Sequence, residues 1–381
     1  MTKPALLNGS ETAPRKLRIV ILGLSITSSW GNGHATTYRA LVRALAQRGH
    51  EVLFLERDMP WYAQNRDLPQ PPFGRTVLYD DLDALRRTHA QAVGDADLVI
   101  VGSFVPEGAA VGDWVLAQAS GLKAFYDIDT PVTLGLLRRD EAPYLKARQI
   151  AAYDLYLSFT GGPTLRRLER EFGSPAARVL YCSVDPLAYF PEAGERDLDL
   201  GYMGTYSADR QPTVERLLAE PARRWPAGRF AVAGPQYPPG LAWPANVLPI
   251  AHLPPHAHRA FYNRQRFTLN VTRADMIEAG WSPSVRLFEA AACATPIVSD
   301  CWAGIDTLLT PGSELFLVER AEEVLDLLRG LPEARRREVG ERARARILAQ
   351  HTSAHRAAEL EAHVHALRSA STSREAVGSA S

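Results

Sequence analysis

The sequence predicts an α/β fold made of two successive Rossmann-like domains with a cleft between them. Short apolar runs alternate with amphipathic segments from residue 18 almost to the end, and the runs are nearly continuously apolar, as buried parallel strands are. The chain has 381 residues, which favours two domains over one. Prolines, a glycine and charged residues cluster over 185–198 and divide the alternation into two series.

The first series contains six apolar runs that we predict as strands. They are Arg18–Leu24, Glu51–Leu55, Asp97–Val101, Lys123–Ile128, Leu155–Phe159 and Val179–Cys182. Amphipathic patterns between them predict helices at Ala35–Arg48, Ala109–Ala119 and Thr164–Phe172. Strands joined by helices run parallel, so their carboxyl ends meet at one edge, where ligands of such sheets usually bind.

The second series repeats this alternation. Its predicted strands are Leu198–Met203, Phe230–Ala233, Phe267–Val271, Pro296–Ser299 and Glu314–Val318. Its predicted helices are Pro212–Leu218, Pro283–Cys293, Ala321–Leu328 and Glu333–Gln350. The Pro- and Trp-rich stretch Pro235–Pro255 predicts a long loop around one further strand.

The domain boundaries follow from the two series. We predict a flexible tail over 1–15, an N-terminal domain over 16–190 and a C-terminal domain over 191–350. A helix over 351–368 could pack back on the N-terminal domain. The small polar residues of 369–381 predict a disordered tail.

The composition is that of a soluble globular protein. The formal net charge is zero and 46% of the residues are hydrophobic, which gives no reason to expect nucleic acid or an anionic membrane as a partner. Three cysteines fit reduced thiols better than a disulfide framework. Residues 1–15 lack the apolar core of a signal peptide, and no run is long enough to be a transmembrane segment, so we expect a cytoplasmic location.

The predicted helix 283–293 has the features of an anion site. Ser282 is a candidate N-cap and Pro283 suits the first helical position, so free backbone N–H groups would face a ligand. Arg286 in the first turn could bind a diphosphate, and Glu289 on the same face could accept hydrogen bonds from a ribose. A cation for diphosphate and a carboxylate for ribose together indicate a nucleotide-sugar site.

Other candidates for this donor site follow neighbouring strands of the second domain. Strand ends and the helix start supply backbone amides, hydroxyls and further cations. These candidates are Gly204, Thr205, Arg210, Asn270, Arg273, Ser284 and Val285.

The acceptor-side candidates lie after the first strand, at Trp30, Gly31, Asn32 and Gly33, followed by His34. Glycines at this position allow a ligand to approach the backbone, although the start of the first helix in such domains is often glycine-rich for structural reasons. The spacing is not G-x-G-x-x-G, which disfavours a hydride-transfer enzyme. His34 could act as a general base, or serve only as a cap or passive contact.

Asp127 and Asp129 end the fourth predicted strand. One of them could orient His34 and stabilise its charged form, while the alternative is an ordinary cap for the following helix. An Asp-x-Asp pair also resembles a metal site, but no further oxygen ligands are evident nearby, so we expect no metal.

These motifs resemble glycosyltransferases of the GT-B fold. Residues 284–300 read S-x-R-x-F-E-A-x-A-C-x-T-P-I-V-S-D and, with the segment 302–308, look most like the spore-maturation CgeB-like glycosyltransferases. Residues 184–191 resemble the V-D-x-x-x-F-x-P element that links the two domains, and residues 31–52 resemble the G-x-G-H pattern of several inverting members. Two positions depart from the pattern: Ala294 stands where glycine is usual, and Trp281 where retaining members often carry a glutamate.

The resemblance implies a glycosyltransferase that takes a sugar from a nucleoside-diphosphate sugar, with a UDP-sugar as the default. The C-terminal domain would bind the donor, arginines would replace a divalent cation, and no cofactor beyond the sugar donor is expected. His34 would act as base in an inverting reaction on a hydroxyl of a polysaccharide, a protein or a small metabolite. Two alternatives stay open: a nucleotide-sugar 2-epimerase-like enzyme, and a non-catalytic nucleotide- or carbohydrate-binding protein on the same fold.

Overall fold

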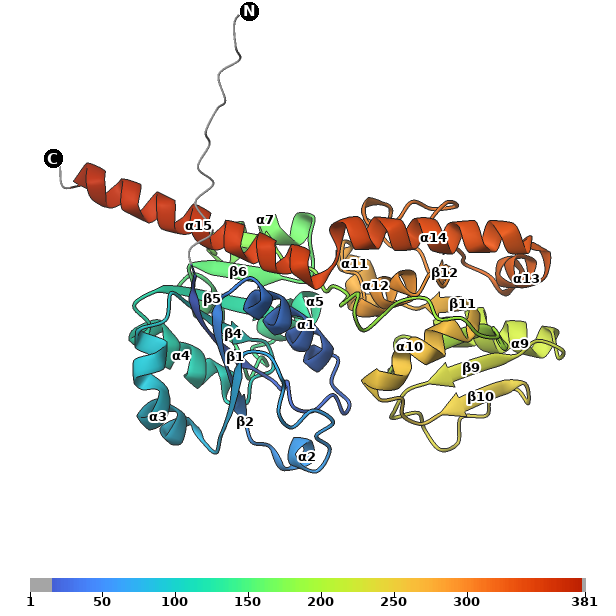
Figure 1. The fold of residues 1–381 in the computed structure, drawn as a ribbon, viewed down its shortest axis with the longest axis horizontal. Coiled ribbons are helices and arrows are strands. Elements are labelled where there is room, and N and C mark those ends of the chain that lie inside the picture. Colours follow the sequence, from blue (N-terminus) through green and yellow to red (C-terminus); the bar gives the residue numbers. More distant parts are fainter. Residues whose placement is uncertain (1–15, 379–381) are drawn as a thin grey trace, which may run out of the picture.

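Two α/β domains lie side by side in the computed structural model (Figure 1), which describes residues 16–378, with side-chain surroundings to residue 370. The N-terminal domain is built on a seven-stranded sheet of order β3-β2-β1-β4-β5-β6-β7, and the C-terminal domain on a six-stranded sheet of order β10-β9-β8-β11-β12-β13. Neighbouring strands pair in parallel throughout both sheets. The prediction of a two-domain α/β fold is therefore confirmed.

The elements of the N-terminal domain alternate strictly between strand and helix until β5. Its strands are β1 Arg18–Gly23, β2 Glu51–Arg57, β3 Arg75–Tyr79, β4 Leu98–Gly102, β5 Leu122–Asp127, β6 Leu155–Ser158 and β7 Ala177–Val179. Its helices are α1 His34–Gln47, α2 Pro60–Ala63, α3 Leu82–Gly94, α4 Gly108–Gln118, α5 Thr130–Arg138, α6 Ala147–Ile150 and α7 Pro163–Glu171.

The C-terminal domain follows the same plan and ends in three helices. Its strands are β8 Leu198–Met203, β9 Phe230–Ala233, β10 Val247–Ile250, β11 Gln265–Asn270, β12 Ile297–Ser299 and β13 Phe316–Leu317. Its helical segments are α8 Gln211–Val214, the π-helix η1 Glu215–Ala219, α9 Glu220–Arg224, α10 Pro255–Asn263, α11 Ala274–Ala279, α12 Val285–Ala292, the 3-10 helix η2 Ile305–Thr307, α13 Ala321–Gly330, α14 Glu333–Gln350 and α15 Ser353–Gly378.

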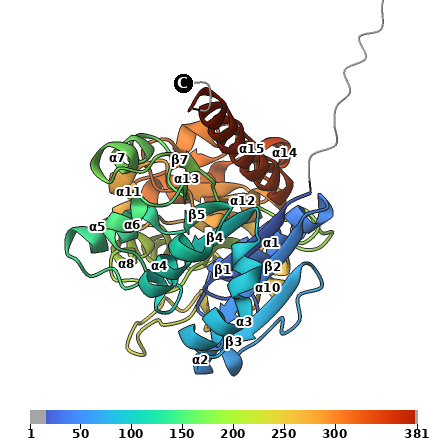
Figure 2. The ribbon, with the colours of Figure 1, turned by 90° about the vertical axis from the view of Figure 1, so that its left-hand side faces the viewer.

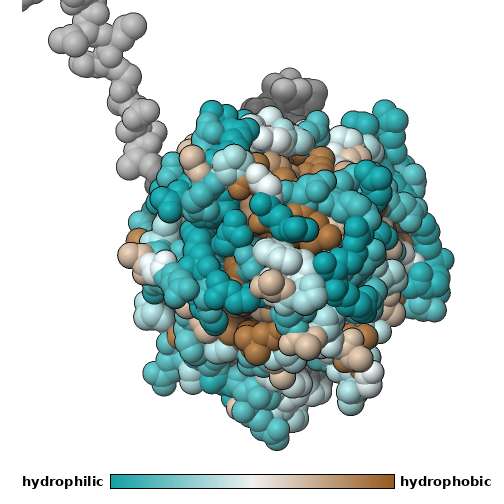
Figure 3. Space-filling view, turned by 90° about the vertical axis from the view of Figure 1, so that its right-hand side faces the viewer, coloured by the Kyte–Doolittle hydropathy of each residue, from teal (hydrophilic) through white to brown (hydrophobic). Residues whose placement is uncertain are grey.

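Burial on both faces explains why the strand sequences are almost purely apolar. On β1, Ile19 and Ile21 belong to one buried apolar cluster, whereas Val20 and Leu22 belong to another on the opposite face of the sheet. Successive side chains of a strand point to opposite faces, so both faces must be apolar when helices cover both. The outer end of the C-terminal domain, in contrast, shows a mainly hydrophilic surface with small apolar areas (Figure 3).

The chain crosses between the domains twice, at neighbouring points. After α14 it returns to the N-terminal domain, where α15 packs along α1 (Figures 1 and 2). Backbone hydrogen bonds join Val184 to His351 and to Ser353, so the two crossings are held together. The carboxylate of Glu361 on α15 accepts hydrogen bonds from Arg48 and contacts Nε2 of His50. These contacts fasten the C-terminal helix to the first domain.

Several predicted boundaries were wrong, for local reasons. Strand β3 was missed because four of its five residues are partly or largely exposed and its sequence is only partly apolar. The strand predicted at 179–182 lies earlier, as β7, and the predicted helix 283–293 begins only at Val285. Helix α15 continues to Gly378, where we predicted disorder from residue 369, because extending an existing helix needs no new nucleus. The predicted tail 1–15 and residues 379–381 lie outside the described residues.

Candidate active site

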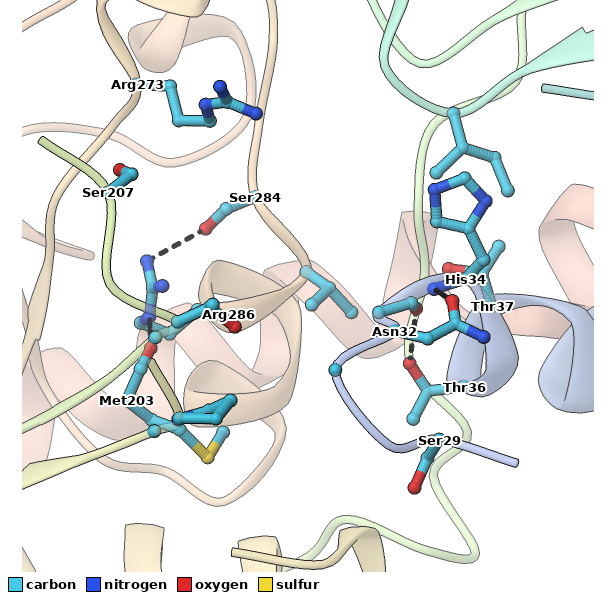
Figure 4. Close-up of a pocket in the computed structure, with 18 of the residues that line it drawn as sticks. Ser29, Asn32, His34, Thr36, Thr37, Met203, Ser207, Arg273, Ser284 and Arg286 are labelled. Atoms are coloured by element: carbon cyan, nitrogen blue, oxygen red, sulfur yellow. Dashed lines mark hydrogen bonds between the residues drawn. The ribbon is translucent and has the colours of Figure 1, made fainter. Parts of the chain in front are cut away.

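A cavity of about 610 Å³ lies between the two domains, at the carboxyl ends of both sheets. Residues from both domains line it, and Figure 4 shows Ser207, Arg273, Ser284 and Arg286 of the C-terminal domain on one side and the start of α1 on the other. Ligands of open parallel sheets bind at this edge, because the loops there are free to vary while the strands hold them in place. The cavity is therefore the candidate active site.

Arg286 is the most firmly held cation of the site. It lies in the first turn of α12 and only 6% of its surface is exposed. Its Nε donates to the carbonyl of Met203 at 2.5 Å, and its Nη1 donates to Oδ1 of Asn270 at 2.8 Å. The guanidinium also lies 4.9 Å from the centroid of the Tyr202 ring. These contacts fix the direction of the guanidinium before any ligand binds.

Asn270 is a positioning residue in the structure, not a ligand contact. We predicted that it could reach the base or the sugar, but its side chain is fully buried and does not line the cavity. Its Oδ1 accepts from Ser284 at 2.8 Å as well as from Arg286, and its Nδ2 donates to Ser299 at 2.9 Å. The side chain points along the sheet because these partners satisfy both ends of the amide.

The start of α12 also differs from the prediction, although it faces the cavity as expected. Ser282 does not cap the helix, because its hydroxyl pairs with Thr160 of the other domain at 2.8 Å. Ser284 occupies the N-cap position instead, but its hydroxyl donates to Oδ1 of Asn270 and not to the helix. Ser284 and Val285 line the cavity, so the free amides at the start of α12 are directed at it.

The loop after β8 brings backbone close to Arg286. A Cβ atom on Gly204 would lie 2.9 Å from Nη2 of Arg286 and 2.6 Å from the hydroxyl of Tyr202, so only glycine fits there. Thr205 follows it, and its carbonyl accepts a hydrogen bond from Arg210. Each of the three predicted residues Gly204, Thr205 and Arg210 lines the cavity.

Arg210, Arg273 and Arg286 together make this wall strongly cationic. Burial lowers the pKa of Arg210, and the guanidinium groups of Arg286 and Arg273 lower it further. Arg210 donates to the hydroxyl of Ser207 at 2.9 Å. Arg273 precedes α11, lies 3.8 Å from Asp209, and its buried Nε has no hydrogen-bond partner. Such a cluster is stable only where an anion or solvent compensates it.

Glu289 lies one turn beyond Arg286 on α12 and reaches the same cavity. Its side chain is almost fully buried and accepts a hydrogen bond from the hydroxyl of Tyr262 at 3.0 Å. One oxygen is thereby fixed, and the carboxylate retains further acceptor positions for hydroxyl groups of a ligand.

His34 is the first residue of α1 and faces the cavity from the N-terminal domain (Figure 4). Its backbone N–H donates to Oδ1 of Asn32 at 2.9 Å, and its ring meets Phe104 edge-on at 5.5 Å between centroids. Nε2 lies 3.5 Å from Oδ2 of Asp129. The other nitrogen, Nδ1, is buried and has no hydrogen-bond partner among the described residues.

Asp127 and Asp129 have different surroundings, although only one residue separates them. Asp129 lines the cavity, and despite its burial, the contact with His34 and the charges of Arg273 and Arg210 hold its pKa below the ordinary value. Asp127 turns into the core and accepts hydrogen bonds from Tyr156 at 2.5 Å and Thr133 at 2.8 Å. The structure thus assigns the contact with His34 to Asp129 and not to Asp127.

The loop before α1 places its glycines on the cavity and its tryptophan outside. Gly31 has a φ of +60°, and both Gly31 and Gly33 line the cavity with no atom near the position of an added Cβ. Trp30, which we predicted on the acceptor side, does not line the cavity, and 43% of its surface is exposed. A side chain at a loop tip can point either way, so sequence alone could not decide this.

Several lining residues were not predicted. They come from loops far apart in the sequence and include Phe104, Pro235, Gln236, His252, Leu253, His258 and Tyr262. Of these, His258 contacts the carbonyl of Leu253 at 3.0 Å and the hydroxyl of Tyr189 at 3.2 Å. The positions after β9 and β10 could have been found from the rule that strand ends line the cleft, but only once the strand order was known.

Two further properties concern the whole of the described chain. Residues 16–370, whose side chains the structure describes, contain no group of three or more His, Cys, Asp or Glu side chains that could hold a metal ion. Within the same range, no helix is both long enough and apolar enough to cross a bilayer.

Known proteins resemble this chain in two ways. Residues 210–362 match a family model described as glycosyl transferase-like. No curated protein sequence gives a significant match. Sucrose-phosphate synthase from Thermosynechococcus elongatus has a similar structure, with a TM-score of 0.69 and 16% identity over 93% of this chain and 100% of that chain.

Two other similar structures were solved with nucleotides. Anabaena HepE in complex with UDP and glucose has a TM-score of 0.68 and 12% identity, over 92% of this chain and 99% of that chain. An α-glucosyltransferase in complex with UDP has a TM-score of 0.69 and 12% identity, over 92% of this chain and 100% of that chain. The chain thus has the GT-B fold, and residues 210–362 are similar to the glycosyl transferase-like family, while the resemblance to the CgeB-like family stays a prediction.

Proposed function

We propose that this chain is a glycosyltransferase that moves a sugar from a UDP-sugar to a hydroxyl group of an acceptor without a divalent cation. The observation that carries the proposal is the opposition of two walls across one cavity. Arg210, Arg273 and Arg286 lie on the C-terminal wall, and the His34–Asp129 pair lies on the N-terminal wall. The arginine wall would bind the diphosphate of a donor, and the His34–Asp129 pair would take the proton from a hydroxyl nucleophile.

The C-terminal wall would bind the donor. Arg286, held by Met203 and Asn270, and the amides at the start of α12 would stabilise the charge that develops on the leaving diphosphate. Fixed cations can take the place of a divalent metal here, because their directions need no reorganisation during the reaction. Glu289 would hold the ribose hydroxyls. Support for UDP comes from the similar structures, several of which contain UDP or UDP-glucose.

The N-terminal wall would activate the acceptor. Asp129 favours a proton on Nε2 of His34, so the lone pair remains on Nδ1, which has no protein partner. Nδ1 would take the proton of the acceptor hydroxyl as its oxygen bonds to the anomeric carbon. The bond from that carbon to the diphosphate oxygen breaks, and its electron pair leaves with UDP. Direct displacement of this kind inverts the anomeric centre. Because Nδ1 is enclosed, the ring or Phe104 must shift before an acceptor reaches it.

The proposal is tested by measuring UDP binding in the presence of EDTA and hydrolysis of a panel of UDP-sugars by mass spectrometry. We expect UDP to bind the wild type, and the variants Arg286→Ala and Glu289→Ala to bind it at least about 30-fold more weakly. His34→Ala should bind UDP normally but lose turnover. If no uridine nucleotide binds, the proposal is wrong.

The same experiment separates the two alternatives. An epimerase-like enzyme would convert the donor sugar in the absence of any acceptor, which mass spectrometry combined with sugar analysis would detect. A non-catalytic binding protein would bind UDP through Arg286 and Glu289, but His34→Ala would change no rate. Since cysteines 182, 293 and 301 are all free thiols, we also propose that the protein acts in the cytoplasm.

A further inference from the structure

The two walls of the cavity differ in charge. Among the described residues that line it, the arginines all come from the C-terminal domain, and the N-terminal wall contributes no lysine or arginine. That wall consists of small, hydroxyl-bearing and apolar residues, namely Leu24, Ser29, Gly31, Asn32, Gly33, His34, Thr36, Thr37, Phe104, Ile128, Asp129 and Phe159. Its only carboxylate is Asp129, whose pKa is held below the ordinary value, so it is ionised at neutral pH. An anionic acceptor would therefore meet a negative charge and no cation on this wall.

Two arginines that contact the segment before α1, Arg39 and Arg66, are already paired. Arg39 makes two hydrogen bonds to Asp67, at 2.8 and 2.9 Å. Arg66 makes an ion pair with Asp58 at 2.5 Å. Neither guanidinium is free to bind a phosphate or a carboxylate, so this part of the surface favours a neutral ligand.

Two exposed indoles lie on the same domain as this wall. Trp30 is 43% exposed and Trp61 is 48% exposed, and they are the two tryptophans among the exposed large apolar side chains of the described chain. Trp61 lies on α2, at the lower edge of the N-terminal domain on the side toward the C-terminal domain (Figure 1). Trp30 directly follows Ser29, which lines the cavity. Both indoles are therefore accessible to a ligand.

Hydrogen bonds hold the two indole-bearing segments together. The hydroxyl of Ser28 donates to the carbonyl of Asn65 at 2.7 Å and accepts from the backbone N–H of Trp30 at 3.3 Å. Nδ2 of Asn65 donates to the carbonyl of Trp61 at 2.7 Å. These bonds join the loop at Trp30 to helix α2, and the same loop contributes Ser29 and Gly31 to the acceptor wall.

We infer that the acceptor is a neutral carbohydrate of at least two sugar units, which stacks on Trp30 and Trp61 and extends its reacting hydroxyl to His34. Indole faces bind the apolar faces of sugar rings, and their rigid rings cost little conformational entropy on binding. The hydroxyl groups of Thr36 and Thr37 and the amide of Asn32 offer donors and acceptors for sugar hydroxyls. This inference rests on the proposed function, because the acceptor site is defined by His34.

The test is binding of the labelled protein, with UDP present, to an array that carries three kinds of probe. These are neutral oligosaccharides of glucose, galactose, mannose and N-acetylglucosamine, acidic oligosaccharides that contain uronic acid, sialic acid or sulfate, and single-stranded DNA. The variants are Trp30→Ala, Trp61→Ala and the matching Phe variants, which keep an aromatic face. Leu248→Ala is the control, since Leu248 is 47% exposed on β10 of the other domain.

We expect binding to one class of neutral oligosaccharide, a loss of about tenfold in each Ala variant, and a smaller loss in the Phe variants. Leu248→Ala should bind as the wild type does. Binding only to acidic glycans or DNA, no binding to any probe, or binding that is unchanged in both Ala variants would overturn the inference. Thermal stabilisation by UDP, measured on the same samples, reports the donor site separately. If UDP stabilises the protein but no neutral glycan binds, the acceptor inference fails and the proposed function stands.

Discussion

Replacing Asp127 and Asp129 separately by asparagine should have opposite consequences for stability and for activity. Asp127 is fully buried, and its burial raises the pKa from the ordinary value of 3.8 to about 6, although hydrogen bonds from Tyr156 and Thr133 oppose the shift. Asp129 faces the cavity and its pKa is lowered. Ionised Asp127 thus destabilises the folded state at neutral pH, whereas the negative charge of Asp129 acts on His34 in the site.

The magnitude follows from the shift of Asp127. A folded-state pKa above the unfolded value means that the folded protein binds the proton more tightly, so the free energy of unfolding decreases as the pH rises from about 4 to about 6. A difference of about 2 pKa units corresponds to about 3 kcal/mol, of which about 2 kcal/mol falls between about pH 4.5 and pH 7.5. Asparagine stays neutral throughout, and its amide can keep hydrogen bonds to the same partners.

The assay is urea unfolding of the wild type and of Asp127→Asn at about pH 4.5 and at about pH 7.5. Unfolding is monitored through the fluorescence of the N-terminal domain. We expect the variant to gain about 2 kcal/mol relative to the wild type between the lower and the higher pH. His351 titrates over the same range, because burial lowers its pKa to about 4, and it destabilises the protein as the pH falls. Its contribution is the same in both proteins and cancels in the comparison.

Activity gives the second half of the test. Asp127→Asn should retain most of the UDP-sugar hydrolysis of the wild type, whereas Asp129→Asn should lose at least about 100-fold, because the imidazolium of His34 loses its counter-charge. The reasoning would be refuted if Asp127→Asn lost as much activity as Asp129→Asn. It would also be refuted if the stability difference between the wild type and Asp127→Asn did not change with pH.

Three further predictions concern other parts of the chain. Arg286→Lys keeps the charge but cannot reproduce the hydrogen bond from the guanidinium to Asn270. Isothermal titration should therefore show about 30- to 100-fold weaker UDP binding, and an unchanged affinity would contradict the role of the oriented guanidinium. Ala294 has a φ of +51°, which is unfavourable for a residue with a Cβ atom. Ala294→Gly should therefore raise the free energy of unfolding by about 1 kcal/mol, and any destabilisation would count against backbone strain at this helix end. Glu361→Ala leaves Nε2 of the buried His50 ring without its partner, so we expect a loss of about 2 kcal/mol in the free energy of unfolding and faster hydrogen exchange in α15. Unchanged exchange in α15 would show that apolar packing alone holds the helix.

Much of the fold could be predicted from the sequence, because both sheets are buried on both faces and their strands are almost purely apolar. The elements that escaped prediction have mixed or short patterns, as in the half-exposed strand β3. In the site, Arg286 and His34 were identified because each lies at the start of a helix, and Glu289 because it shares a face of the same helix with Arg286. A helix that starts at the carboxyl edge of a parallel sheet faces the cleft regardless of its tertiary contacts, so such residues can be identified from the sequence.

The sequence by itself determined the class of fold, the wall that carries the cations and the helix start that carries the histidine. Only the tertiary structure decided that Asp129 and not Asp127 meets His34, that Asn270 holds Arg286 instead of a ligand, and that Trp30 lies outside the cavity. The physical reason is that periodicity along a chain records local burial. The direction of a side chain at a strand end or loop tip, in contrast, depends on partners that are distant in the sequence, such as Tyr156 for Asp127.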